Sequence, residues 1–279
     1  MNDVGVAFAL IAALAFGVSD FVAGLMSRRA AAFAVAVVAQ AAATAMIAVI
    51  APFSDWTTSL SAFAWGALSG VGSGAGTAFL YRGLGSARMS VVASLSSVCA
   101  AGLPVVVGVG LGERPSLLGI CGIAIAIPAV WLVSRSGDAR PRGVASGVID
   151  GAVAGGGFAL LYIALAQVPA EAGLWPLAVG QATSILVVWA FAVRGGVRLR
   201  LPPRLALGGV LVGVLGGGAT LLYMLATRQQ LLAVVAVLTS LYPASTILLA
   251  RIVLRERITA GQGLGLLCAA AAVSLIAVG

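Results

Sequence analysis

Long apolar runs separated by short polar breaks extend along the whole sequence and limit the folds open to it. A helix needs about 20 apolar residues to cross the hydrocarbon core of a bilayer. Runs of about that length cover 4–26, 33–51, 62–81, 89–111, 116–134, 144–166, 173–193, 205–226, 231–252 and 260–278. The sequence therefore predicts an all-α polytopic membrane protein of ten transmembrane helices, whose short loops leave function to the inside of the bundle.

Composition excludes the common soluble classes. The 279 residues are 61% hydrophobic and 9% charged, whereas soluble globular proteins carry about 25% charged residues. So few charges exclude a disordered chain and a cytosolic enzyme. Because histidine is absent, the chain has no histidine base, metal ligand or proton relay. We expect no catalytic residues, no metal site and no cofactor.

The basic residues predict the orientation in the membrane. All 16 are arginine, and they lie singly or in pairs between apolar runs, which indicates topology signals and no nucleic-acid partner. The odd-numbered loops hold 14 of them, and the other face has only Arg114 and Arg228. We therefore expect the arginine-rich face in the cytoplasm of an inner or plasma membrane, with both termini on the other side.

The two halves of the chain share spaced residues. At an offset of 143 positions the matches are Glu113 with Glu256, Val91-Val92-Ala93 with Val234-Val235-Ala236, and Gly66, Gly70 and Gly74 with Gly209, Gly213 and Gly217. The halves are 1–137 and 138–279, with five predicted helices each. An odd number of helices inverts the second half, and inverted repeats build transporters with a site between the halves. Since one chain supplies both halves, we expect a monomer.

Two long segments carry a recognisable pattern. They read YRGLGSARMSVVASLSSVCAAGLPVVVGVGLGERPSLLG and LATRQQLLAVVAVLTSLYPASTILLARIVLRERITAGQGLG. Each has a helix rich in small residues, then a turn ending in Glu-Arg, then a glycine-bearing helix. This pattern resembles the drug/metabolite transporter superfamily, in its ten-helix EamA branch. Members typically carry a proline 13 residues before the glutamate; Pro243 fits, whereas the first half has Ala100 there.

The resemblance implies a central cavity lined by the first, third and fourth helices of each half. It also implies a small-molecule substrate, since members resembling this chain include exporters of amino acids and related metabolites. It implies cytoplasmic termini, which disagrees with the arginine count; we keep the count as the orientation prediction.

Two carboxylates fall within predicted spans, Asp20 and Asp150. Both lie about 9 Å inside the arginine-rich boundary, on helices that the repeat makes counterparts. Acids in the membrane usually face the bundle interior or a water-filled cavity, so the pair is a candidate proton or cation site. The alternative is pairing with nearby arginines: Arg28 or Arg29 for Asp20, and Arg140 or Arg142 for Asp150.

Polar residues at matching or mid-span positions are candidates for the cavity wall. They are Tyr242, Gln40, Gln181, Ser94, Ser97, Thr239 and Ser240. The amides could instead join helices, and the hydroxyls could bond their own backbone. Tyr81, Tyr162 and Tyr223 lie near span ends, where an interfacial aromatic belt explains them at least as well as a cavity.

Two further features of the sequence concern helix packing and the turns between helices. The spacing of Gly66, Gly70 and Gly74, and of Gly213 and Gly217, predicts close helix packing. Glu113 and Glu256 are expected at tight turns as structural hinges or gate supports.

Together these features predict a secondary transporter of small metabolites, an amino-acid exporter of aromatic or broad specificity working by alternating access. The alternative is a proton-coupled exporter of cationic drugs; a non-transporting membrane scaffold is less favoured. The expected partners are a small-molecule substrate and the lipid bilayer.

Overall fold

A computed structural model describes residues 3–54, 59–85, 89–134, 144–253 and 259–278. Apart from its loops the described chain is helical, and it has no strand. Its helices are α1 (Asp3–Ser27), α2 (Ala32–Ile50), α3 (Leu60–Gly85), α4 (Met89–Gly110), α5 (Leu117–Ser134), α6 (Val144–Ala166), α7 (Trp175–Arg194), α8 (Pro203–Thr227), α9 (Leu232–Thr239), α10 (Tyr242–Val253) and α11 (Ala260–Val278), with 3-10 turns η1 (Ala51–Phe53) and η2 (Ala170–Ala172). Five segments, on α1, α2, α6, α7 and α8, are long and apolar enough to cross a membrane. The predicted all-α membrane fold is confirmed, while the count of ten crossings stays a prediction.

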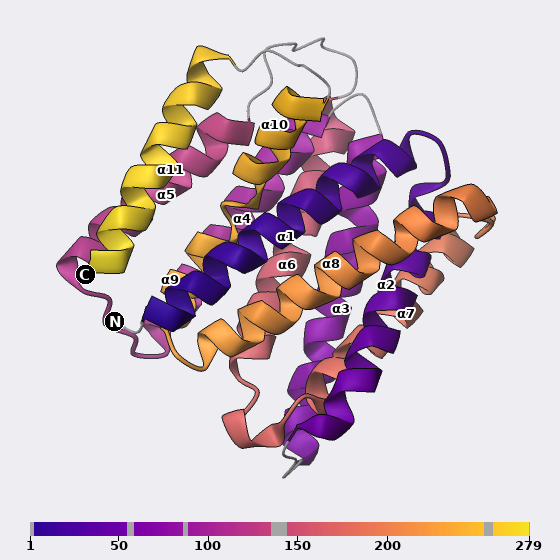
Figure 1. The fold of residues 1–279 in the computed structure, drawn as a ribbon, viewed down its shortest axis with the longest axis horizontal. Helices are drawn as coiled ribbons and strands as arrows, with labels where there is room; N and C mark the ends of the chain where they lie inside the picture. Colours follow the sequence, from indigo (N-terminus) through magenta and orange to yellow (C-terminus); the bar gives the residue numbers. More distant parts are fainter. Residues whose placement is uncertain (1–2, 55–58, 86–88, 135–143, 254–258, 279) are drawn as a thin grey trace.

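The helix ends follow local chemistry. α1 ends at Ser27, immediately before the paired Arg28 and Arg29. The turn after α4 passes through Gly112, whose φ of +96° is a left-handed conformation that glycine adopts without steric cost. α1 begins and α11 ends at the same end of the bundle (Figure 1). We call this the terminal end. The opposite end, where Arg28 and Arg29 follow α1 and Arg82 lies in the last turn of α3, is the arginine-rich end.

The expected helix 231–252 is broken in two, which corrects the prediction. α9 ends at Thr239 and α10 begins at Tyr242, with a turn between them. Pro243 favours the break, because it has no N–H to donate to the Thr239 carbonyl one turn earlier. At the corresponding position α4 has Ala100, and α4 continues unbroken to Gly110.

The helices pack in reciprocal pairs. α3 packs against α6 and α7, and α8 packs against α1 and α2. α4 contacts α6 and α9, while α5 packs along α11 at one side of the bundle (Figure 1). The first and second halves are therefore interleaved, and most packing joins a helix of one half to a helix of the other.

Glycines allow the closest of these approaches. A Cβ on Gly66 would overlap the Pro176 carbonyl of α7, and one on Gly70 would overlap the Gly180 carbonyl. For Gly74, a Cβ would lie 2.7 Å from the Ser184 carbonyl oxygen, again on α7. The stripe 66, 70 and 74 therefore lets the backbones of α3 and α7 touch.

The second predicted glycine pair lies at the contact of α8 with α2. A Cβ on Gly213 would overlap the Ala39 carbonyl, and one on Gly217 would lie 2.8 Å from the Ala43 Cβ. These two glycines also line the central cavity.

The outside of the bundle is apolar. Val106, Leu207 and Leu267 are each at least 71% exposed, although leucine and valine are normally buried in soluble proteins. Serine, threonine and glutamine side chains are instead found buried in the interior. This distribution suits a protein surrounded by lipid tails.

Candidate substrate cavity

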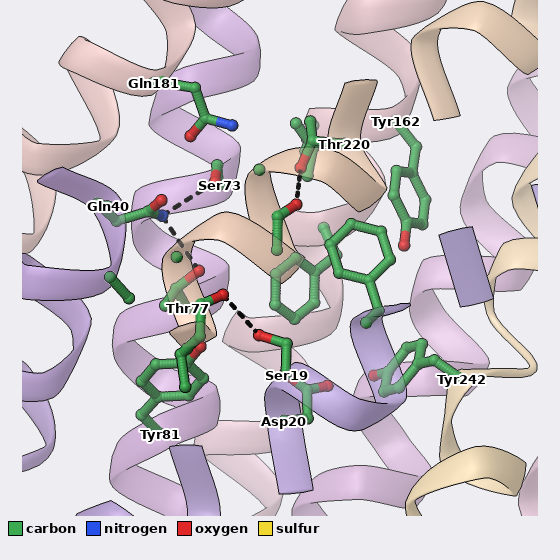
Figure 2. A pocket seen from close by; sticks show the side chains of 18 residues that line it. Ser19, Asp20, Gln40, Ser73, Thr77, Tyr81, Tyr162, Gln181, Thr220 and Tyr242 are labelled. Atoms are coloured by element: carbon green, nitrogen blue, oxygen red, sulfur yellow. Dashed lines mark hydrogen bonds between the residues drawn. The ribbon is translucent and has the colours of Figure 1, made fainter. Parts of the chain in front are cut away.

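A cavity lies in the interior between helices of both halves. Figure 2 shows its labelled side chains converging from α1, α2, α3, α6, α7, α8 and α10. The polar and aromatic residues lining it are Phe16, Ser19, Asp20, Gln40, Ser73, Thr77, Tyr81, Phe158, Tyr162, Gln181, Thr220 and Tyr242. The space that water can occupy is about 40 Å³, and one water needs about 10–15 Å³ by this measure. The cavity thus has room for a few waters and is too small, as it stands, for a molecule of amino-acid size.

Asp20 is a charged residue in the wall of the cavity. It lies in the last third of α1 and is partly buried. Among the residues that line the cavity within the described chain, it is the single formally charged side chain. Within the described residues Asp20 forms no salt bridge. The salt bridge found there joins Arg82 to Asp150. The alternative in which Asp20 pairs with Arg28 or Arg29 is therefore not the arrangement observed.

Asp150 lies elsewhere. It forms a salt bridge with Arg82 at the arginine-rich end, with Arg82 Nε donating to its Oδ1 at 3.1 Å. The Arg82 guanidinium also lies over the Phe79 ring, 4.3 Å from its centroid. The expected partners, Arg140 and Arg142, lie outside the described residues. The two predicted carboxylates therefore lie in different places. Asp20 lines the cavity, whereas Asp150 forms a salt bridge that joins α6 to α3.

The two predicted glutamines both reach the cavity but differ in their bonding. Gln40 Nε2 on α2 donates to Ser73 Oγ at 3.1 Å and to Thr77 Oγ1 at 3.3 Å, both on α3. Gln181 on α7 has a buried Oε1 with no hydrogen-bond partner among the described residues. Gln40 therefore joins two helices, whereas Gln181 presents an acceptor that a bound molecule could use (Figure 2).

Tyr242 stands at the break between α9 and α10 and lines the cavity. Its hydroxyl lies 3.5 Å from Ser96 Oγ on α4, and Ser97 interacts with the same hydroxyl. Thr239 and Ser240 are fully buried beside the break and do not line the cavity. Their hydroxyls have no hydrogen-bond partner in the described part of the chain. The side chain of Ser94 and all of Glu256 lie outside the described residues.

The interfacial-belt interpretation of three tyrosines is wrong. Tyr81, Tyr162 and Tyr223 are at most 5% exposed, and the first two line the cavity. Tyr223 stacks on Tyr162 with ring centroids 4.3 Å apart, and its hydroxyl donates to the Tyr162 carbonyl at 3.3 Å. These aromatic side chains line and support the cavity instead of anchoring the protein at the membrane surface.

Comparison with known proteins identifies the family. The sequence model of the EamA-like transporter family matches residues 141–278, the second half of the chain. The chain belongs to the EamA-like transporter family. As an EamA-like protein of the drug/metabolite transporter superfamily, it is a multi-pass membrane transporter of small molecules, in a family of transporters and not of enzymes.

One solved structure, described as "Crystal structure of protein", is similar to this EamA-like chain over its whole length. The match covers 99% of this chain and 96% of that one, with a TM-score of 0.76 and 14% sequence identity. At this identity the likeness shows the fold alone. No curated protein matches the sequence.

Sequence reasoning missed several cavity residues in this EamA-like fold. Ser73, Thr77 and Tyr81 follow one another at intervals of four along α3, on one helix face. A polar stripe in an apolar helix indicates a face turned to the cavity, so these residues could have been predicted from the sequence. The glycine spacing in the same helix was interpreted instead. Ser19 on α1 and Thr220 on α8 have no comparable periodic signal.

Proposed function

We propose that this EamA-like transporter is a secondary transporter that exports amino acids, aromatic ones included, by alternating access. The observation that carries the proposal is the Asp20 carboxylate in a cavity lined by aromatic rings, amides and hydroxyls. A membrane carboxylate without an arginine partner is expensive, and such residues usually mark substrate or ion pathways.

The chemistry of the wall suits a molecule with an ammonium group. The ammonium would bind Asp20 by a charge-assisted hydrogen bond, and the faces of Tyr81, Tyr162 and Tyr242 would add cation–π and stacking contacts. The substrate carboxylate would be met by a neutral donor such as the Tyr242 hydroxyl, and the unpartnered Gln181 Oε1 would accept a hydrogen bond from the ammonium group.

A second candidate, a proton-coupled exporter of cationic drugs, is favoured by a specific observation. No arginine is among the described residues that line the cavity, so a substrate carboxylate has no cationic partner there. A lipophilic cation needs none, and Asp20 could then carry either the cation or a proton.

Alternating access follows from two features. The cavity is too small for an amino acid as it stands, so helices must separate for a substrate to enter. The reciprocal packing of α3 on α6 and α7, and of α8 on α1 and α2, is the pattern that two inverted five-helix halves, 1–137 and 138–279, would produce. We propose that these halves rock about the cavity, in a monomer in the inner membrane with its arginine-rich end in the cytoplasm.

Counterflow in proteoliposomes tests the proposal. Vesicles loaded with an unlabelled amino acid should take up its labelled form, with aromatic amino acids and lipophilic cations tested in parallel. Asp20→Asn should reduce saturable uptake at least tenfold, whereas Asp3→Asn, an exposed acid at the start of the same helix, should leave it unchanged. Full uptake by Asp20→Asn would overturn the role of the carboxylate. If the vesicles take up lipophilic cations but none of the amino acids, the cationic-drug exporter replaces the amino-acid exporter as the proposed function.

A further inference from the structure

A carboxylate from one half of the chain binds the end of a helix in the other half. Glu113 lies in the turn between α4 and α5, at the terminal end of the bundle. Its Oε1 accepts a hydrogen bond from the Leu232 N–H at 2.6 Å, and its Oε2 accepts one from the Ala233 N–H at 3.0 Å. These N–H groups open α9, and the first N–H groups of a helix have no partner within it. The negative charge also suits the positive end of the α9 dipole.

The turn that carries Glu113 is built to hold the carboxylate there. The Glu113 N–H donates to the Gly108 carbonyl at 3.0 Å, and Gly112 supplies the left-handed residue that reverses the chain. A Cβ on Gly108 would overlap the Glu113 carboxylate. The absence of a side chain at Gly108 therefore leaves room for the carboxylate beside the start of α9.

α9 is a short helix that a turn separates from α10. It has eight residues, all of them buried. Its first residue is bound by Glu113 at the terminal end, and its last leads through the turn to Tyr242 in the cavity wall. None of the eight α9 residues lines the cavity, but a movement of α9 away from Glu113 would separate it from α4 at the terminal end and shift Tyr242 in the cavity wall at the same time.

We propose that α9 is a gate at the terminal end of the bundle, and that Glu113 is the latch that holds it shut. The proposal rests on the proposed transport function. Opening breaks the two hydrogen bonds to Leu232 and Ala233, after which water solvates the carboxylate and the N–H groups. The latch keeps the terminal end closed when no substrate is present.

Cysteine accessibility tests the gate without any substrate. Cys99, Cys121 and Cys268 are free thiols and would first be replaced by alanine. A reporter cysteine at Val235, a fully buried residue of α9, is then treated with a membrane-impermeant maleimide in proteoliposomes. Glu113→Ala should raise its labelling rate at least about tenfold, because a bidentate charged cap is lost, and Glu113→Gln should raise it less.

Two controls make the result specific. Asp3→Asn removes an exposed acid at the start of α1, also at the terminal end, and should leave the labelling rate unchanged. A second reporter at Ser245 on α10, also buried, should remain unreactive in every variant. Unchanged labelling at Val235 in Glu113→Ala would overturn the latch, and equal labelling at both reporters would show general loosening and overturn the gate. Failure of amino-acid counterflow would leave this measurement unaffected, so the two proposals fail separately.

Discussion

Two adjacent glycines on α6 offer a matched test of the helix packing. A Cβ on Gly157 would lie 2.6 Å from the Gly76 backbone nitrogen and 2.8 Å from the Gly72 carbonyl oxygen, both on α3. A Cβ on Gly156, one position earlier, would have nothing within 4 Å. The same change to alanine therefore meets rigid backbone at one position and open space at the next.

The free energies can be estimated from these contacts. Overpacking a close contact costs about 1–3 kcal/mol, and α3 and α6 must move apart because backbone atoms cannot turn aside. Both variants gain up to about 1 kcal/mol from the higher helix propensity of alanine. Gly157→Ala should therefore be less stable than Gly156→Ala by about 1–3 kcal/mol.

Thermal unfolding of the two purified variants in the same detergent measures this difference. At about 2–4 °C per kcal/mol for a chain of this size class, Gly157→Ala should unfold roughly 2–12 °C below Gly156→Ala. Gly156→Ala itself should unfold at or slightly above the temperature of the parent protein. Equal midpoints for the two variants, or a lower one for Gly156→Ala, would refute the close contact of α3 with α6.

Two further changes test single bonds by the same unfolding assay. Arg82→Gln should destabilise the protein by about 1–3 kcal/mol, because the Asp150 side chain is 9% exposed and loses its cation. Adding Asp150→Asn should recover part of that loss, and a double variant no more stable than Arg82→Gln would contradict the buried charge as its cause. Tyr223→Phe keeps the ring stack on Tyr162 but removes the hydroxyl that donates to its carbonyl, so it should cost about 0.5–1.5 kcal/mol. An unchanged midpoint would show that this hydrogen bond contributes nothing to stability.

The helices themselves were predictable because each is encoded by residues next to one another. An apolar run of sufficient length forms a helix in a membrane, where every backbone group must be bonded within the chain. The runs 4–26 and 205–226 became α1 and α8 with ends shifted by one or two residues. The break before Pro243 was not predicted, because a proline inside a membrane helix is also compatible with an unbroken one, as Pro104 in α4 shows.

The cavity was predictable only in part. Asp20, Gln40, Gln181 and Tyr242 stood out as polar side chains in apolar spans, and all four line it. Asp150 stood out in the same way, yet it pairs with Arg82, 68 positions earlier in the chain. A polar residue in an apolar run indicates an interior position, but it does not say which neighbour it will meet there.

The sequence shows that the chain forms a bundle of membrane helices, because that depends on hydrophobicity over about 20 neighbouring residues. It also shows which helices carry polar groups. Which polar groups meet depends on the tertiary fold. The Glu113 carboxylate binds N–H groups 119 and 120 positions away, and Ser96 reaches Tyr242 across 146 positions. Such contacts depend on how helices from the two halves cross, and that crossing is set by the shapes of glycine-lined surfaces that no single segment contains.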